Sequence, residues 1–304
     1  MEICVLGLSR VVSGDGRSVL VRHQRARALL ACLAARPRRL VPRDLLAEEV
    51  WGGAPPDAAR TTVRSYVARL RRELAPVAEA TGVVVSLDGG YLLDVEDDQV
   101  DWIRFSRDVE AGTALLAAGR VADALEAAQH ALASWGGPPF LDLPCSPRAQ
   151  ELVAQLDQLR LRALEVEGEA MLLADQHEEL VPRLAGLVVE HPLEERFWEL
   201  LLRALLRCGR RAEALAAYGQ AQASLQAELG VGPGPRLRAA CALAHEVDGR
   251  EHEAGASAPV VLVPAPRDGR LEDRRHADRR QADRRAAAPS PAGDLRSLLE
   301  PVGR

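Results

Sequence analysis

Apolar residues in the first 96 positions follow a pattern whose period changes along the chain. Residues 3–8 and 18–22 are short runs rich in Val, Leu and Ile, with the turn sequence SGDG at 13–16 between them. Runs of this kind, bounded by Gly and Asp, predict two β-strands joined by a turn. Near the end of the segment, residues 83–95 (VVVSLDGGYLLDV) predict a β-hairpin centred on DGG at 88–90.

Between these strands the apolar period becomes helical. Residues 25–37 (RARALLACLAARP) carry a leucine face and end at Pro37, which predicts a first helix. Residues 42–52 (PRDLLAEEVWG) predict a second helix, with Pro42 in its first turn and Gly52 as its C-cap. A third helix is predicted over residues 57–74 (DAARTTVRSYVARLRREL), with Asp57 as its N-cap.

The third predicted helix has two chemically different faces. Its buried stripe is Val63, Val67, Leu70 and Leu74. The opposite face mixes short side chains with guanidinium groups: Thr61, Arg64, Ser65, Ala68, Arg69 and Arg72. Short residues let a helix backbone approach a DNA groove, and Arg reaches phosphate or guanine. A solvated basic face would have the same composition, but strands, three helices and a closing hairpin together favour a winged helix.

From residue 97 to 247 the chain is rich in Ala and Leu and predicts helices almost throughout. The segment ALLAAGRVADALEAA at 114–128 recurs as ALLRCGRRAEALAAY at 204–218, with Gly119 and Gly209 in equivalent places. A weaker copy has Asp175 at that place, and the spacing of 34 residues to Gly209 is the tetratricopeptide period. Gly permits a left-handed turn between antiparallel helices, and Asp tolerates one. The pattern predicts stacked helical hairpins.

Residues 248–304 are rich in Ala, Pro, Gly and charge, and they predict a mostly disordered tail. The tail contains a five-residue repeat, DRRHA, DRRQA and DRRAA, at 273–287. Auxiliary electrostatic contact with DNA or a polymerase is one interpretation of these arginine pairs. A soluble low-complexity segment is the other interpretation. It is favoured because the Asp next to each arginine pair lowers the local positive charge.

The charge is distributed unevenly along the chain. The whole sequence has a net charge of −5 and no lysine. Residues 1–96 have a net charge of +3 (14 Arg, 11 acids), residues 97–250 of −9 (15 Arg, 24 acids), and residues 251–304 of +1 (10 Arg, 9 acids). Residues 1–96 are therefore the segment whose charge suits binding to a phosphate backbone. No apolar run is long enough for a membrane helix, and no signal peptide is recognisable, so we expect a cytoplasmic protein without a membrane partner.

The sequence offers no pattern for catalysis or for metal and cofactor binding. It lacks the motifs H-E-x-x-H, G-x-S-x-G and G-x-x-x-x-G-K-[ST], and its five cysteines form no C-x-x-C pair. We therefore expect no enzymatic activity, no cofactor, no ATP dependence and no metal site. The cysteines are expected to be free thiols in a reducing compartment.

Several segments of this sequence resemble those of a known family. RALLACLAARP, DLLAEEVWG, ARTTVRSYVARLRREL and GGYLLDV resemble the OmpR/PhoB-type winged helix of the Streptomyces antibiotic regulatory protein (SARP) family. DWIRFSRDV, HPLEERFWELL and LQAELGVGPGPRL resemble the bacterial transcriptional activation domain that follows it in that family. The resemblance implies an α+β winged helix-turn-helix over residues 1–96, an all-α tetratricopeptide-like domain over 97–247, and the disordered tail over 248–304.

The resemblance also implies which residues face DNA. The third helix becomes the recognition helix and the hairpin becomes the wing, while the start of the first helix is a plausible place for backbone contacts. The residues implied are Arg60, Thr61, Thr62, Arg64, Ser65, Ala68, Arg69, Arg71 and Arg72, with Gly89, Gly90 and Tyr91 of the wing and His23 and Arg25 of the first helix.

The expected function is sequence-specific regulation of transcription. The resemblance implies an activator of a specialised-metabolite gene cluster that binds direct repeats in promoter DNA, helps to recruit RNA polymerase and self-associates on DNA. A repressor would bind DNA in the same way. The alternative from another class is a non-enzymatic scaffold that binds a protein through its helical repeats.

Overall fold

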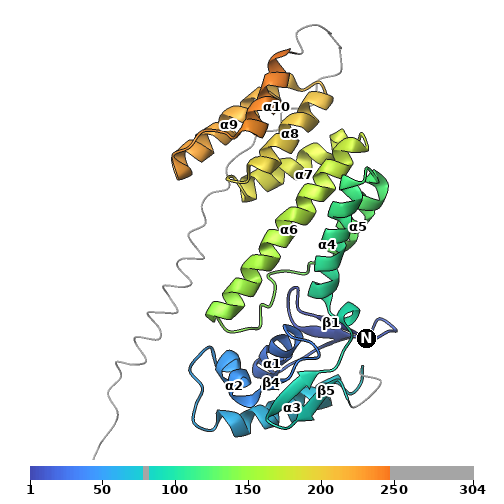
Figure 1. The fold of residues 1–304 in the computed structure, drawn as a ribbon, viewed down its shortest axis with the longest axis vertical. Helices are drawn as coiled ribbons and strands as arrows, with labels where there is room; N and C mark the ends of the chain where they lie inside the picture. Colours follow the sequence, from blue (N-terminus) through green and yellow to red (C-terminus); the bar gives the residue numbers. More distant parts are fainter. Residues whose placement is uncertain (78–81, 247–304) are drawn as a thin grey trace, which may run out of the picture. The chain divides into compact units, whose positions relative to one another are not determined.

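The computed structural model describes residues 1–77 and 82–246 of the 304-residue chain, and Figure 1 shows the order of its helices and strands. A small α+β region comes first and an all-helical region follows it, which confirms the expected fold class. The tail, with its DRRxA repeats, lies outside the described residues. Its predicted disorder therefore stays a prediction.

The first sheet has three short antiparallel strands in the order β1-β2-β3: β1 (Glu2–Cys4), β2 (Arg10–Val12) and β3 (Ser18–Leu20). The sequence pattern predicted two strands here and missed β2. The run 3–8 does not continue as one strand, because the chain turns at Gly7, whose φ is 139°. The predicted SGDG turn is present, and it joins β2 to β3.

Three helices follow, as predicted: α1 (Gln24–Ala34), α2 (Arg43–Trp51) and α3 (Ala59–Leu74). Gly52 ends α2 in the left-handed conformation with a φ of 67°, which confirms it as the C-cap. The N-cap prediction for Asp57 is wrong. Helix α3 starts at Ala59, and the capping residue is Ala58, which offers no side-chain acceptor.

The second sheet contains the predicted hairpin. Strand β6 (Gly90–Leu93) lies between β4 (Val41–Pro42) and β5 (Val84–Leu87), and all pairs are antiparallel. Position 90 requires glycine because a Cβ atom there would lie 2.2 Å from the carbonyl oxygen of Val41. The close approach of β4 to the hairpin therefore fixes the wing against the start of α2.

The remaining described residues form a 3-10 turn, η1 (Asp97–Gln99), and seven α-helices. The helices are α4 (Asp101–Ala117), α5 (Val121–Ala133), α6 (Pro147–Leu173), α7 (His177–Glu190), α8 (Glu195–Arg207), α9 (Arg211–Leu229) and α10 (Pro235–Glu246). The repeat prediction is confirmed at its turns. Gly119, Asp175 and Gly209 have φ values of 74°, 57° and 72°, so each of the three helical hairpins turns through one left-handed residue.

The loop between α5 and α6 folds back onto the residues that follow β1. The backbone N–H groups of Gly136 and Phe140 donate hydrogen bonds to the carbonyl oxygens of Leu6 and Val5, at 2.8 and 2.7 Å. Phe140 enters the core, and it is 2% exposed. One cluster of buried residues accordingly runs from Ile3 through the winged helix to Ala163 in α6.

Asp101, in the first turn of α4, strengthens this connection. Its buried carboxylate accepts hydrogen bonds from the backbone N–H groups of Val5 and Leu6, at 2.8 and 2.9 Å. Strand β1 runs beside the same place, since Ile3 pairs with Val100 in a parallel bridge. The N-terminal segment is thereby held by the first residues of the helical region.

Candidate nucleic-acid interface

Helix α3 is positioned by its apolar stripe. Val63, Val67, Leu70 and Leu74 are all at most 2% exposed, as the sequence predicted, and α3 packs against α1 and α2. Burial of four aliphatic side chains contributes roughly 1.5–3 kcal/mol each, which makes this stripe the main anchor of the helix. The opposite face of α3 is left for other contacts.

A polar cluster fixes α2 relative to α1. The Cys32 thiol donates to Glu49, and Arg36 donates to the same carboxylate, with Nη2 2.6 Å from Oε1. Burial raises the pKa of the Cys32 thiol well above its ordinary value, so the thiol keeps its proton. Burial also raises the pKa of the Glu49 carboxyl, but the hydrogen bonds from Arg36 and Cys32 outweigh it and the net direction is downward. The cluster holds the two helices that support α3.

The outward face of α3 has the composition that the sequence predicted. Thr61, Arg64, Ser65, Ala68, Arg69 and Arg72 are all exposed. Within residues 1–77 and 82–246, no hydrogen bond or ion pair involves the guanidinium groups of Arg64, Arg69 and Arg72. The three cations therefore lie on the same exposed face as the small side chains of Thr61, Ser65 and Ala68.

The N-terminal end of α3 is already engaged by other protein groups. Arg60 forms an ion pair with Asp44 at the start of α2, and both side chains are mostly exposed, at 73% and 60%. The Thr62 hydroxyl donates to the carbonyl oxygen of Ala58, 2.9 Å away. An exposed ion pair contributes only about 0–1 kcal/mol, so phosphate would compete readily for Arg60.

The structure gives Arg71 a role different from the predicted one. Its Nε and Nη2 atoms donate to the carbonyl oxygen of Val84, at 2.9 and 2.6 Å, and Nη2 also donates to the Ser86 hydroxyl, at 2.8 Å. Arg71 thus ties the recognition-helix candidate to β5. It positions the hairpin and is not free for phosphate in this arrangement.

The three wing residues predicted to face DNA differ in their exposure to solvent. Gly89 is exposed at the tip, with a φ of 84°, and lies beside the exposed Asp88 and Leu87. Gly90 and Tyr91 are buried, and the guanidinium of Arg43 lies 5.9 Å from the centre of the Tyr91 ring. The ring of Tyr91 therefore supports the sheet, and we leave Tyr91 and Gly90 out of the proposed interface.

His23 and Arg25, at the start of α1, are half-buried. The His23 ring lies 4.9 Å from the Tyr66 ring. Arg25 donates to the carbonyl oxygen of Val50 and lies 5.3 Å from the centre of the Trp51 ring. Both side chains therefore brace α1 against α2 and α3, and any contact they make with DNA uses the part that remains exposed.

Sequence reasoning missed one exposed cation beside the wing. Arg39 lies in the loop before β4, and β4 pairs with β6 of the hairpin. No contact of its guanidinium with another described residue is recorded. An Arg in a loop has no periodic signal, so only the pairing of β4 with the hairpin identifies its neighbourhood.

Residues 1–77 and 82–246 contain neither a metal-site cluster nor a membrane-spanning helix. No group of three or more His, Cys, Asp or Glu side chains within 1–77 and 82–246 has the arrangement of a metal site. Among the helices of these residues, none combines the length and apolar character needed to span a membrane.

The α+β region and the helical region each match a known protein family. Residues 18–93 match the family described as "Transcriptional regulatory protein, C terminal", and residues 100–244 match "Bacterial transcriptional activator domain". The two matches meet near η1, where the winged helix gives way to α4.

Individual relatives agree with this assignment. The chain is 36% identical to the transcriptional regulator RedD of Streptomyces coelicolor, over 87% of this chain and 73% of RedD. It is 33% identical to the regulatory protein DnrI of Streptomyces peucetius, over 78% of this chain and 89% of DnrI. Among solved structures, Mycobacterium tuberculosis EmbR in complex with a low affinity phosphopeptide matches with a TM-score of 0.74 and 30% identity, over 81% of this chain and 65% of that chain.

Proposed function

Because this chain belongs to the Streptomyces antibiotic regulatory protein family of transcriptional regulators, we propose that it binds direct repeats in promoter DNA and activates a specialised-metabolite gene cluster. Helix α3 enters the major groove, and the β5–β6 hairpin lies along the neighbouring backbone. The helical region helps to recruit RNA polymerase, and copies of the chain associate on adjacent repeats.

One observation carries the DNA-binding proposal. The exposed face of α3 presents three guanidinium groups without protein partners among the described residues, and it also carries the short side chains of Thr61, Ser65 and Ala68. Paired arginines would have to give up a carboxylate before meeting DNA, whereas Arg64, Arg69 and Arg72 need not. Guanidinium groups bind guanine and phosphate through two parallel hydrogen bonds, and the small residues let the helix approach closely.

We assign the base-reading role to Arg64 and Arg69, near the middle of α3, and a phosphate-binding role to Arg72, near its end. Arg60 joins the interface by exchanging Asp44 for phosphate. Arg71 acts indirectly by holding β5 against α3.

The test is footprinting and fluorescence anisotropy with DNA from the chain's own gene neighbourhood, at two salt concentrations and with unrelated competitor DNA. We expect protection of a short direct repeat and an affinity that falls steeply with salt. The variant Arg64→Ala/Arg69→Ala should weaken specific binding by roughly 10²-fold or more, because each base contact contributes about 1–3 kcal/mol.

The matched control is Arg17→Ala, in the turn between β2 and β3, whose guanidinium is also exposed and lies outside the proposed interface. This variant should bind like the wild-type protein. Unchanged binding by the Arg64/Arg69 double variant would reject the recognition-helix assignment. Absence of sequence-specific binding by the wild-type protein would favour the scaffold function instead.

A further inference from the structure

Helix α8 is buried on nearly all sides. It packs against α6, α7, α9 and α10, and eight of its thirteen residues are buried, including Phe197, Trp198 and Glu199. Arg196, Arg203 and Arg207 are 7 and 4 positions apart and so lie on one face of the helix. The Arg196 and Arg203 side chains are 18% and 29% exposed, and Arg207 is exposed. We call these three residues the α8 arginine stripe.

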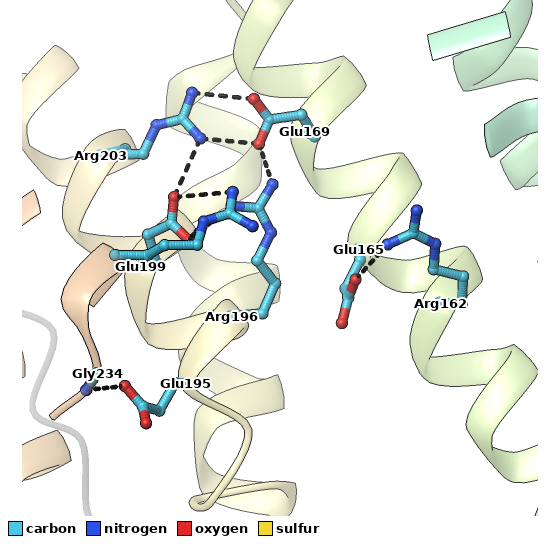
Figure 2. A network of polar contacts seen from close by, with 9 residues as sticks. Arg162, Glu165, Glu169, Glu195, Arg196, Glu199, Arg203 and Gly234 are labelled. Carbon is cyan, nitrogen blue, oxygen red and sulfur yellow. Dashed lines mark hydrogen bonds and ion pairs between the residues drawn. The ribbon is translucent and has the colours of Figure 1, made fainter. Parts of the chain in front are cut away.

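Two carboxylates, those of Glu169 and Glu199, lie beside Arg196 and Arg203 (Figure 2). Glu169 of α6 accepts two hydrogen bonds from Arg203, at 2.8 and 3.0 Å, and a third from Arg196. Glu199 lies 2.7 Å from Arg196 and 3.6 Å from Arg203. The Glu169 and Glu199 side chains are 17% and 9% exposed.

A fourth arginine reaches the same carboxylates from α10. The Nε atom of Arg236 lies 3.2 Å from Oε2 of Glu199, and its Nη2 lies 3.5 Å from Oε1, yet the side chain is 70% exposed. The neighbouring acid Glu195 is turned elsewhere, since its Oε2 accepts the N–H of Gly234 at 2.5 Å (Figure 2). Arg236 is therefore held loosely at the border of the stripe.

The Glu169 carboxylate of this cluster stays ionised. Burial raises the pKa of the Glu169 carboxyl, but the hydrogen bond from Arg203 and the charges of Arg196 and Arg203 outweigh it and hold the pKa below its ordinary value. Glu169 therefore remains a negatively charged partner of Arg196 and Arg203.

The charges do not balance. Three guanidinium groups share the carboxylates of Glu169 and Glu199, and Arg207 is exposed with no partner recorded among the described residues. A positive excess therefore gathers on one face of a segment, residues 97–250, whose net charge is −9. Arg207 and Arg236 are exposed, so an incoming carboxylate can reach both without displacing Glu169 from its arginine partners.

We propose that the α8 arginine stripe, together with Arg236, is a docking surface for an acidic segment of a protein partner. Exposed Asp or Glu side chains of the partner pair with Arg207 and Arg236 and complete the network that Glu169 and Glu199 begin. Guanidinium groups bind carboxylates through two parallel hydrogen bonds, which suits this chemistry. The acidic character of the rest of the region repels a long DNA backbone, whereas a short acidic segment meets only the stripe.

This surface can be tested on the full chain with a short fluorescein-labelled peptide of alternating Glu and Ala residues. The matched peptide has Gln in place of every Glu. In anisotropy titrations we expect the Glu peptide to bind, with an affinity that falls as salt rises, and the Gln peptide not to bind. Equal binding of the two peptides, or no binding of the Glu peptide, would overturn the proposal.

Substitutions localise the binding. Arg207→Gln/Arg236→Gln should raise the Kd for the Glu peptide about tenfold or more, because charge-assisted hydrogen bonds are lost. Arg207→Gln alone should raise it by a smaller factor, and it removes no recorded contact in the fold. The control is Arg238→Gln, an exposed residue two positions after Arg236 and therefore on another side of α10. Wild-type affinity in the double variant would place the peptide elsewhere and reject the assignment.

The same variants separate this surface from the proposed DNA interface. Arg64→Ala/Arg69→Ala should retain peptide binding, and Arg207→Gln/Arg236→Gln should retain binding to the direct-repeat DNA. If the stripe variant lost DNA affinity and kept peptide affinity, the surface would be a nucleic-acid site and the docking proposal would fail.

Discussion

Oδ1 of Asp142 lies 2.7 Å from Nε of Arg27, and this ion pair joins the loop before α6 to helix α1. The two side chains are only 5% and 18% exposed. The other oxygen of Asp142 accepts the N–H of Ser9, at 2.8 Å. One carboxylate therefore satisfies groups from both the first sheet region and the first helix of the winged helix.

Removal of this carboxylate should destabilise the protein. Asp142→Ala leaves a nearly buried guanidinium and a backbone N–H without their acceptor, so we expect the free energy of unfolding to fall by about 2–4 kcal/mol. Urea denaturation followed by circular dichroism measures this. The control is Asp123→Ala, which removes an exposed partner of Arg120 and should lower the free energy by less than about 1 kcal/mol. Similar values for the two variants would contradict the role given to Asp142.

Asp101 predicts a pH dependence of stability. Burial raises the pKa of its carboxyl from 3.8 to about 6, over the opposing hydrogen bonds from the N–H groups of Leu6, Val5 and Trp102. A folded-state pKa above the unfolded value means that this group favours folding most below about pH 4, and that the contribution is lost as the pH rises through about 6.

The measurement is the difference in unfolding free energy between the wild-type protein and Asp101→Asn, which cannot ionise. Relative to the variant, the wild-type protein should lose stability between about pH 4 and 6, by on the order of 3 kcal/mol for the full shift. The difference should become constant at higher pH. A pH-independent difference would show that Asp101 does not titrate in this range.

The apolar stripe of α3 can be separated from its exposed face by two neighbouring substitutions. Val67 is 1% exposed, so Val67→Asp buries a charge without a partner and should abolish cooperative unfolding of the winged helix. Ala68→Asp, on the exposed face, should leave the thermal unfolding midpoint nearly unchanged and weaken DNA binding by repelling phosphate. A cooperatively folded Val67→Asp variant would mean that the stripe is misplaced.

The three hairpin turns of the helical region differ in how much strain they contain. Asp175 has a φ of 57°, a conformation that costs a side-chain-bearing residue more than it costs glycine. We expect Asp175→Gly to raise the free energy of unfolding by about 0.5–1 kcal/mol, and Gly209→Ala to lower it by about 1 kcal/mol or more. Thermal denaturation of both variants checks the two signs. A destabilising Asp175→Gly would indicate that the contact of Asp175 with His177, 3.2 Å long, outweighs the backbone strain.

The parts of this fold that sequence could predict are governed by local rules. The stripe from Val63 to Leu74 follows the helical period, and it is buried as expected. The turns at Gly119 and Gly209 follow from the conformational freedom of glycine, and the repeat extended the same argument to Asp175. In each case the residue types near the position determine the local structure.

The parts that sequence could not predict depend on contacts between distant residues. Strand β2 is three residues long and pairs only because Gly7 turns the chain back. Tyr91 looks like a wing-tip residue in sequence, but pairing of β6 with β4 buries it. The family resemblance places Arg71 among the DNA-facing residues, and only the position of Val84 shows that it binds the hairpin. The residue pattern within each of these segments does not indicate which distant residues it contacts.

The core that runs continuously from Ile3 to Ala163 limits where a recombination crossover between two relatives can leave a stable hybrid. A crossover near residue 96 would separate Ile3 and Val5 from Asp101 and Phe140, and a hybrid would then need matching surfaces from both parents. A crossover in the turn at Asp175, after α6, leaves these contacts within one parental sequence. The winged helix should therefore be inherited together with helices α4 to α6, and functional chimaeras of these regulators should be joined in the turn at Asp175.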